Sequence, residues 1–177
     1  MSLTRRRFSA ALLAAAATPQ PSILVHEHVL VNFARAPYNP HVVFQQIKPK
    51  LDEIAKLGCQ RFLDCTPNFI GRDPKLLARL QDATGIEIWT NTGLYAARNY
   101  QYLPPYAKTE TPDQLARRFT EEARKGIAGV KPRFIKIGVN RGPLAELDKK
   151  IVRAAALCCR ETGLPIASHT GNGIAAS

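Results

Sequence analysis

The sequence comprises 177 residues, 45% hydrophobic and 22% charged, which is the size and composition of one globular domain or of part of one. Its apolar runs are shorter than the roughly 18 residues of a membrane-spanning helix, so we expect no membrane anchor. The formal net charge is +11, but outside one N-terminal cluster the basic residues are scattered, and we therefore expect no nucleic-acid partner.

The first 21 residues have the order of an export signal. Arginines at 5–7 precede an alanine-rich apolar stretch at 10–17, and Thr18 and Pro19 follow it. The segment from Thr4 to Phe8 resembles a twin-arginine motif, which a receptor reads as an address. We predict a signal peptide over 1–21 and a periplasmic location, with an amphipathic N-terminal helix as the alternative.

Strand and helix patterns alternate along the rest of the chain. Asp73 and Pro74 can cap and open a helix, and Gly58 and Gly163 are typical residues after a helix end. A Tyr- and Pro-rich loop is expected over 96–109. Strands are expected over 23–30, 61–65, 86–90, 133–137 and 164–169, and helices over 42–57, 73–85, 111–125 and 143–162.

This alternation is typical of parallel βαβ units. Five such strands suit a doubly wound sheet or part of a (β/α)8 barrel. No GxGxxG motif follows the first strand, which disfavours a dinucleotide-binding fold. Cys59, Cys65, Cys158 and Cys159 match no zinc-ribbon spacing, and we expect them to be buried free thiols.

Three of the four histidines fall near the ends of expected strands. His26 and His28 are two residues apart, so their side chains point to the same face of a strand, where two neutral imidazoles can chelate one divalent ion. His169 closes the fifth strand, where a core histidine is the alternative. Only His41 falls in a loop, and we interpret it as a surface residue.

Lys136 lies in the middle of an apolar strand. Burying an ammonium group is costly, so such a lysine must be paired, neutralised or modified. Reaction with CO2 would convert the amine into a carbamate, whose two oxygens can bridge two metal ions. A lysine that reaches water or a carboxylate at the strand end is the alternative.

Taken together, these motifs resemble the phosphotriesterase family of the amidohydrolase superfamily. The resemblance extends over residues 23–173 and implies an α/β fold, a partial (β/α)8 TIM barrel of about the first five βα units, with a binuclear metal centre. The residues that carry it are His26, Glu27 and His28 and the segments 64–73, 92–95, 134–137 and 163–170.

The resemblance also implies the parts of the site. His26 and His28 would bind the more buried of two divalent ions, expected to be zinc, and His169 the more exposed one. Carboxylated Lys136 would bridge them, and Tyr95 would line the substrate pocket. The implied reaction is hydrolysis of a small phosphotriester, lactone or carboxylic ester by a metal-activated hydroxide.

The chain departs from the family pattern after its fifth strand. The family has a further histidine on strand six and a catalytic aspartate on strand eight, whereas here no histidine follows His169 and no acidic residue follows Glu161. We therefore expect residues 22–177 to be a truncated N-terminal part of such a hydrolase, without a catalytic residue of its own and with its activity in isolation left open. The alternative is an inactive exported metal- or ligand-binding barrel fragment, and a homodimer is a further assembly left open.

The export signal leads to the first testable prediction. Replacing Arg5 and Arg6 by lysine should trap the precursor in the cytoplasm, because the receptor reads the arginine pair. Cell fractionation followed by immunoblotting measures this, with cleavage expected near Ala17 in the unsubstituted chain. Unchanged export of the substituted chain would reject the twin-arginine route.

Overall fold

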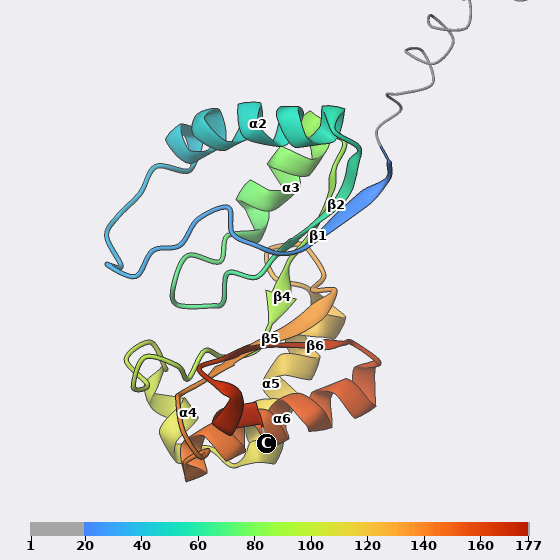
Figure 1. The fold of residues 1–177 in the computed structure, drawn as a ribbon. Coiled ribbons are helices and arrows are strands. Elements are labelled where there is room, and N and C mark those ends of the chain that lie inside the picture. The colour runs from blue at the N-terminus through green and yellow to red at the C-terminus, as the bar shows by residue number, and fades with distance from the viewer. Residues whose placement is uncertain (1–19, 177) are drawn as a thin grey trace, which may run out of the picture.

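The computed structural model describes residues 20–176, so most of the predicted signal peptide lies outside the described residues. Strands and helices alternate as expected (Figure 1). The strands are β1 Ser22–Glu27, β2 Cys59–Asp64, β3 Glu87–Trp89, β4 Asn91–Thr92, β5 Phe134–Val139 and β6 Ile166–Thr170. The helices are α2 Pro40–Lys56, α3 Pro74–Thr84, α4 Pro105–Thr109, α5 Pro112–Lys125 and α6 Glu146–Thr162, followed by the 3-10 turn η1 Gly173–Ala176.

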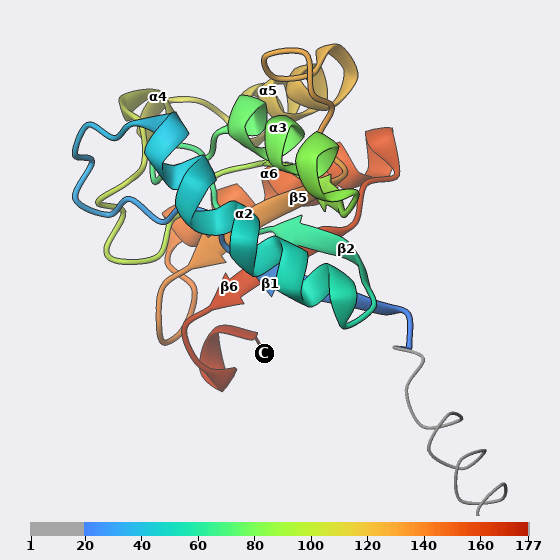
Figure 2. The same cartoon turned by 90° about the horizontal axis from the view of Figure 1, so that it is seen from above.

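The strands form two parallel three-stranded sheets, β1-β2-β3 and β4-β5-β6. Between the sheets, the expected third strand over 86–90 divides at Thr90 into β3 and β4. Helices α2 and α3 lie at one end of this strand layer and α5 and α6 at the other (Figure 1). The view turned by 90° again places α2 and α3 side by side, and it shows η1 next to β6 (Figure 2).

Apolar side chains form a separate core on each sheet. Under α2 and α3 the core includes Leu51, Phe62 and Leu80. Under α5 and α6 it includes Phe119 and Ile135. Each helix pair therefore covers one face of its own sheet, the arrangement that βα repetition requires. Within the described residues, no helix is both long and apolar enough to cross a membrane.

Several expected boundaries differ from the observed ones, and the end of the first strand has a clear cause. The first strand ends at Glu27 rather than at residue 30, because the Val29 amide donates to the Asp64 carboxylate at 2.8 Å instead of continuing a ladder. His28 therefore lies just beyond the strand. The expected loop over 96–109 contains the short helix α4, and the helix expected from residue 143 begins at Glu146. All four cysteines are free, and three of them are buried.

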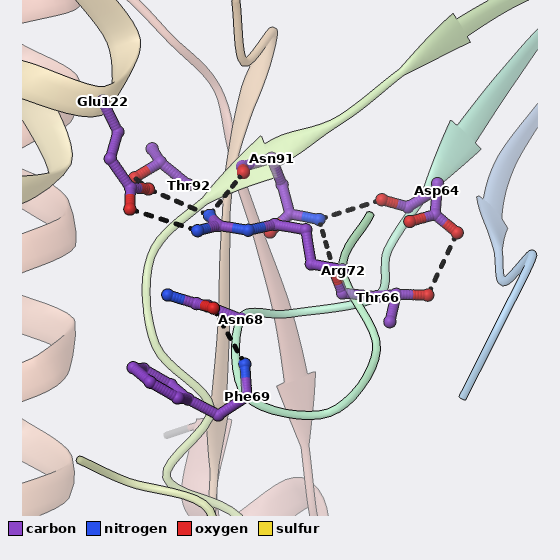
Figure 3. A network of polar contacts seen from close by, with 8 residues as sticks. All are labelled: Asp64, Thr66, Asn68, Phe69, Arg72, Asn91, Thr92 and Glu122. Atoms are coloured by element: carbon purple, nitrogen blue, oxygen red, sulfur yellow. Dashed lines mark hydrogen bonds and ion pairs between the residues drawn. The ribbon is translucent and has the colours of Figure 1, made fainter. Parts of the chain in front are cut away.

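A partly buried ion pair joins the two sheets at the point where the third strand divides (Figure 3). The Arg72 guanidinium, only 4% exposed, donates to both oxygens of Glu122 on α5 at 2.9 and 3.1 Å and to the Asn91 carbonyl at 2.9 Å. The Thr92 hydroxyl donates to the same carboxylate at 2.7 Å. The loop before α3 is thereby tied to α5 and to β4.

Removal of this guanidinium should destabilise the fold. Arg72→Ala leaves the Glu122 carboxylate and the Asn91 carbonyl without their donor, and we expect a loss of about 2–4 kcal/mol in the free energy of unfolding, measured by urea titration. The matched control is Arg118→Ala, since Arg118 pairs with Glu110 at the surface, where a loss below about 1 kcal/mol is expected. Equal losses in the two variants would contradict the importance of the partly buried pair.

Candidate metal centre

All five residues expected at the site line one cavity of about 210 Å³. They are His26, His28, Tyr95, Lys136 and His169. The ring centroids of His26 and His28 are 5.6 Å apart, and those of Tyr95 and His169 are 5.4 Å apart. The cavity lies at the carboxyl ends of β1, β5 and β6 and beyond β4, the edge at which parallel βα folds place their ligands.

Lys136 is buried, with only 1% of its surface exposed. Its Nζ lies 3.3 Å from His26 Nε2, and no acidic side chain among the described residues forms an ion pair with it. Burial lowers the pKa of the amine, because a charged ammonium loses its hydration there. The shift is toward the neutral amine, which is the form that reacts with CO2.

The three histidines favour the neutral imidazole for the same reason. The pKa of His28 is lowered to about 4, first by partial removal from water and then by the charges of His26, Lys136 and His169. The pKa values of His26 and His169 are also lowered, in each case by desolvation first and by Lys136 second. A neutral imidazole is the form that binds a metal ion.

Two residues that sequence reasoning missed orient His28. Thr66 Oγ1 donates to the Asp64 carboxylate at 3.0 Å, and His28 Nδ1 lies 3.1 Å from the same hydroxyl oxygen. Since the hydroxyl proton is given to Asp64, its oxygen accepts from a protonated Nδ1, which leaves Nε2 of His28 free to bind a metal. The clue in the sequence was a pair of polar residues, Asp64 and Thr66, at the carboxyl end of an expected strand.

Asp64 can accept these hydrogen bonds near neutral pH. Burial raises its pKa to about 6, while the donors from Val29 and Thr66 act in the opposite direction. Above that value the carboxylate is mostly ionised and accepts from both donors. Thr66 and Asp64 thus form the kind of hydrogen-bonded support that usually orients a metal-binding histidine, in this case His28.

The donor set fits a metal only if Lys136 takes part. In the part of the chain that the structure describes, no group of three His, Cys, Asp or Glu side chains is arranged to hold a metal ion. A carbamate on Lys136 would add two oxygens that share one negative charge to the cavity that the three imidazoles line. With that modification the set contains the nitrogen and oxygen ligands that zinc accepts.

The parallel βα layer and its histidine- and lysine-lined cavity define part of an α/β barrel with a candidate metal centre. Residues 11–177 match the model of the phosphotriesterase family, and the chain belongs to that family. Aryldialkylphosphatase from Saccharolobus solfataricus is 30% identical over 156 residues, which cover 83% of this chain and 48% of the relative.

Solved structures show the same fold. The phosphotriesterase homology protein from Escherichia coli, crystallised with phosphate in its active site, superposes with a TM-score of 0.74 at 25% identity, over 88% of this chain and 55% of that one. A double mutant of organophosphorus hydrolase from Deinococcus radiodurans superposes with a TM-score of 0.77 at 28% identity, over 85% of this chain and 49% of that one. The chain thus spans about half the length of these relatives.

The orientation of His28 can be tested at Thr66. Thr66→Val keeps the shape of the side chain but removes its hydroxyl, so we expect zinc affinity to fall about 10–100-fold in calorimetric titration. Thr66→Ser retains the hydroxyl and should stay within a few fold of the unsubstituted chain. Equal zinc affinity of the valine and serine variants, both folded by circular dichroism, would show that Thr66 does not orient His28.

Proposed function

We propose that residues 22–177 supply part of the metal centre of an exported hydrolase that cleaves a small ester, lactone or phosphotriester. Two divalent ions, with zinc as the expected element, would be held by His26, His28, His169 and a carboxylated Lys136. The observation that carries the proposal is the buried Lys136 amine, which faces His26 and has no acidic partner among the described residues.

Carboxylation resolves the electrostatic problem of this lysine. The neutral amine attacks the carbon of CO2, an N–C bond forms, and one amine proton passes to solvent. The product is an anion with two oxygens in place of a buried cation. An ammonium there would repel a metal cation held by the neighbouring imidazoles, whereas the carbamate anion would attract it.

The described residues also shape the reaction space. Tyr95 is 7% exposed, and its ring lies on Gly138, where an added Cβ would come within 2.4 Å of it. The ring therefore covers the backbone of β5 and faces His169, narrowing the entrance for a substrate. When bound, divalent ions supply Lewis-acid polarisation of the scissile group and favour deprotonation of the attacking water.

Proton transfer needs a further group. No acidic side chain among the described residues lines the metal cavity, so they provide no carboxylate to accept the proton of the attacking water. The family resemblance described above implies that an aspartate of strand eight has this function. The other parts of the reaction, namely metal binding and substrate positioning, fall to the residues present here.

The names of the relatives support the range of substrates. One is an aryldialkylphosphatase, another an organophosphorus hydrolase, and a third structure is an organophosphate hydrolase engineered from a weak promiscuous lactonase. Phosphotriesters and lactones both contain an electrophilic centre with a polarisable oxygen. A second candidate function is a non-catalytic metal- or ligand-binding protein, which is favoured by the lack of an acidic side chain among the described residues that line the cavity.

The carbamate can be tested directly. The chain is supplied with ¹³C-bicarbonate and zinc, and a carbamate resonance is sought by ¹³C NMR while zinc affinity is measured by calorimetry. We expect the resonance in the unsubstituted chain and in the control Lys131→Met, whose lysine is exposed. Lys136→Met should lose it and bind zinc at least about tenfold more weakly, because one bridging ligand is gone.

The outcomes separate the candidates. Absence of the carbamate, or unchanged zinc affinity in Lys136→Met, would refute the proposed centre. Zinc-dependent hydrolysis of an aryl ester, a lactone or a phosphotriester that Lys136→Met abolishes identifies the hydrolase. Bound zinc and carbamate without hydrolysis of any of the three would support the metal centre alone, because the described residues provide no carboxylate to accept the proton of the attacking water.

A further inference from the structure

A second cavity of about 700 Å³ adjoins the metal cavity. Three side chains, Phe33, Tyr95 and His169, line both. A molecule with its reacting group beside His169 would therefore extend into this larger space. Its remaining wall is polar and basic, formed by the turn after β4 and the loops after β5 and β6, and no acidic side chain among the described residues lines it.

Arg98 is held in this wall by an unusual backbone. Arg98, Asn99 and Tyr100 all have positive φ, at 60, 56 and 64°, a conformation that costs non-glycine residues energy and persists only when the surroundings enforce it. The Asn99 amide donates to Asn140 Oδ1 at 2.8 Å. The Arg98 guanidinium then lies 4.0 Å from the centroid of the Phe33 ring.

The buried Asp148 carboxylate holds this turn in place and forms no ion pair with Arg98. Asp148 is 1% exposed and accepts from the Tyr100 hydroxyl at 2.6 Å and from the Asn140 amide and side chain at 3.1 and 3.2 Å. Asn140 also donates to the Ala96 carbonyl at 3.0 Å. Both Asp148 oxygens are thus occupied by groups that fix the turn.

Arg141 lies on the opposite loop of the same cavity. Its Nε donates to the Gly171 carbonyl at 3.3 Å, and its backbone packs so closely that a Cβ on Gly171 would come within 2.9 Å of the Arg141 amide. The loops after β5 and β6 are thereby held together. Neither Arg98 nor Arg141 forms an ion pair with another described residue.

We propose that the substrate carries an anionic group, a phosphate or a carboxylate, apart from its scissile bond, and that Arg98 and Arg141 bind this group in the larger cavity. The proposal rests on the proposed function, because it takes the metal cavity as the place of reaction. Guanidinium groups suit the planar oxygens of both anions, and a side chain already fixed on Phe33 loses little freedom on binding.

The binding site can be tested on the metal-free chain, dialysed against EDTA so that anions cannot bind zinc. Inorganic phosphate, succinate and the neutral dimethyl succinate are titrated while ¹H–¹⁵N NMR spectra are recorded. We expect saturable shifts of residues 98–99, 140–141 and 169–171 with the anions, and none with the neutral diester. The anion that binds with the higher affinity, phosphate or succinate, identifies the preferred group.

Variants assign the anion to the two arginines. Arg98→Gln and Arg141→Gln should each weaken binding about tenfold, and the double variant should abolish it. Arg160→Gln is the control: it removes the same charge from an exposed arginine on α6, in a groove that Asp113 and Glu161 also line. This control should bind the anions as the unsubstituted chain does. In both chains, the affinity for the anions should fall as salt is added.

Failure of this proposal is distinct from failure of the proposed function. Absence of saturable shifts, or anion binding that persists in the folded double variant, would overturn the anionic-substrate proposal even if the carbamate test succeeds. Shifts of equal size with dimethyl succinate would overturn it as well. If anion binding is lost in the Arg98 and Arg141 variants and kept in the Arg160 control, the anion site is supported. This result does not depend on whether the chain carries the carbamate.

Discussion

The geometry of the site depends on the hydrogen bonds of one residue, Asp64. Its carboxylate takes the Val29 amide and the Thr66 hydroxyl, and its own carbonyl and that of Thr66 accept from the Asn91 side chain at 2.9 Å. One residue at the end of β2 thus ends β1, orients His28 through Thr66 and fixes β4 beside β2. Because these contacts are buried, losing any of them leaves polar groups without partners, which is costly.

A second constraint is the close approach of β4 and β5. Gly93 has φ of +111°, and a Cβ there would come within 2.3 Å of the Lys136 carbonyl. Only glycine allows this contact, which brings the turn carrying Tyr95 over β5 and shields the lysine from water. The burial that lowers the pKa of the Lys136 amine therefore follows from backbone packing as much as from the apolar neighbours of the lysine in the sequence.

Site residues could be predicted from the sequence where the alternation of side chains along a strand, or the end of a strand, fixes their position. His26, His28, Lys136 and His169 lie at strand ends or in strand interiors, and the structure brings their side chains together as expected. The end of β1 and the division of the third strand were missed, because side-chain and interstrand hydrogen bonds decide them. Arg98 was missed since its position depends on a turn with positive φ and on Asn140, distant in sequence.

The positive charge of Arg98, which lines the larger cavity, acts on a histidine of the metal cavity. The pKa of His169 is lowered by desolvation, by Lys136 and then by Arg98, so the arginine acts on the metal-binding side chains as well as on the cavity it lines. In such surroundings a protonated lysine is disfavoured, whereas a carbamate, the negative charge that develops on a hydrolysed ester and an anionic substrate group are all favoured. The same electrostatic field links the two proposals, carboxylation of Lys136 and binding of an anionic substrate group, because both place negative charge beside these basic side chains.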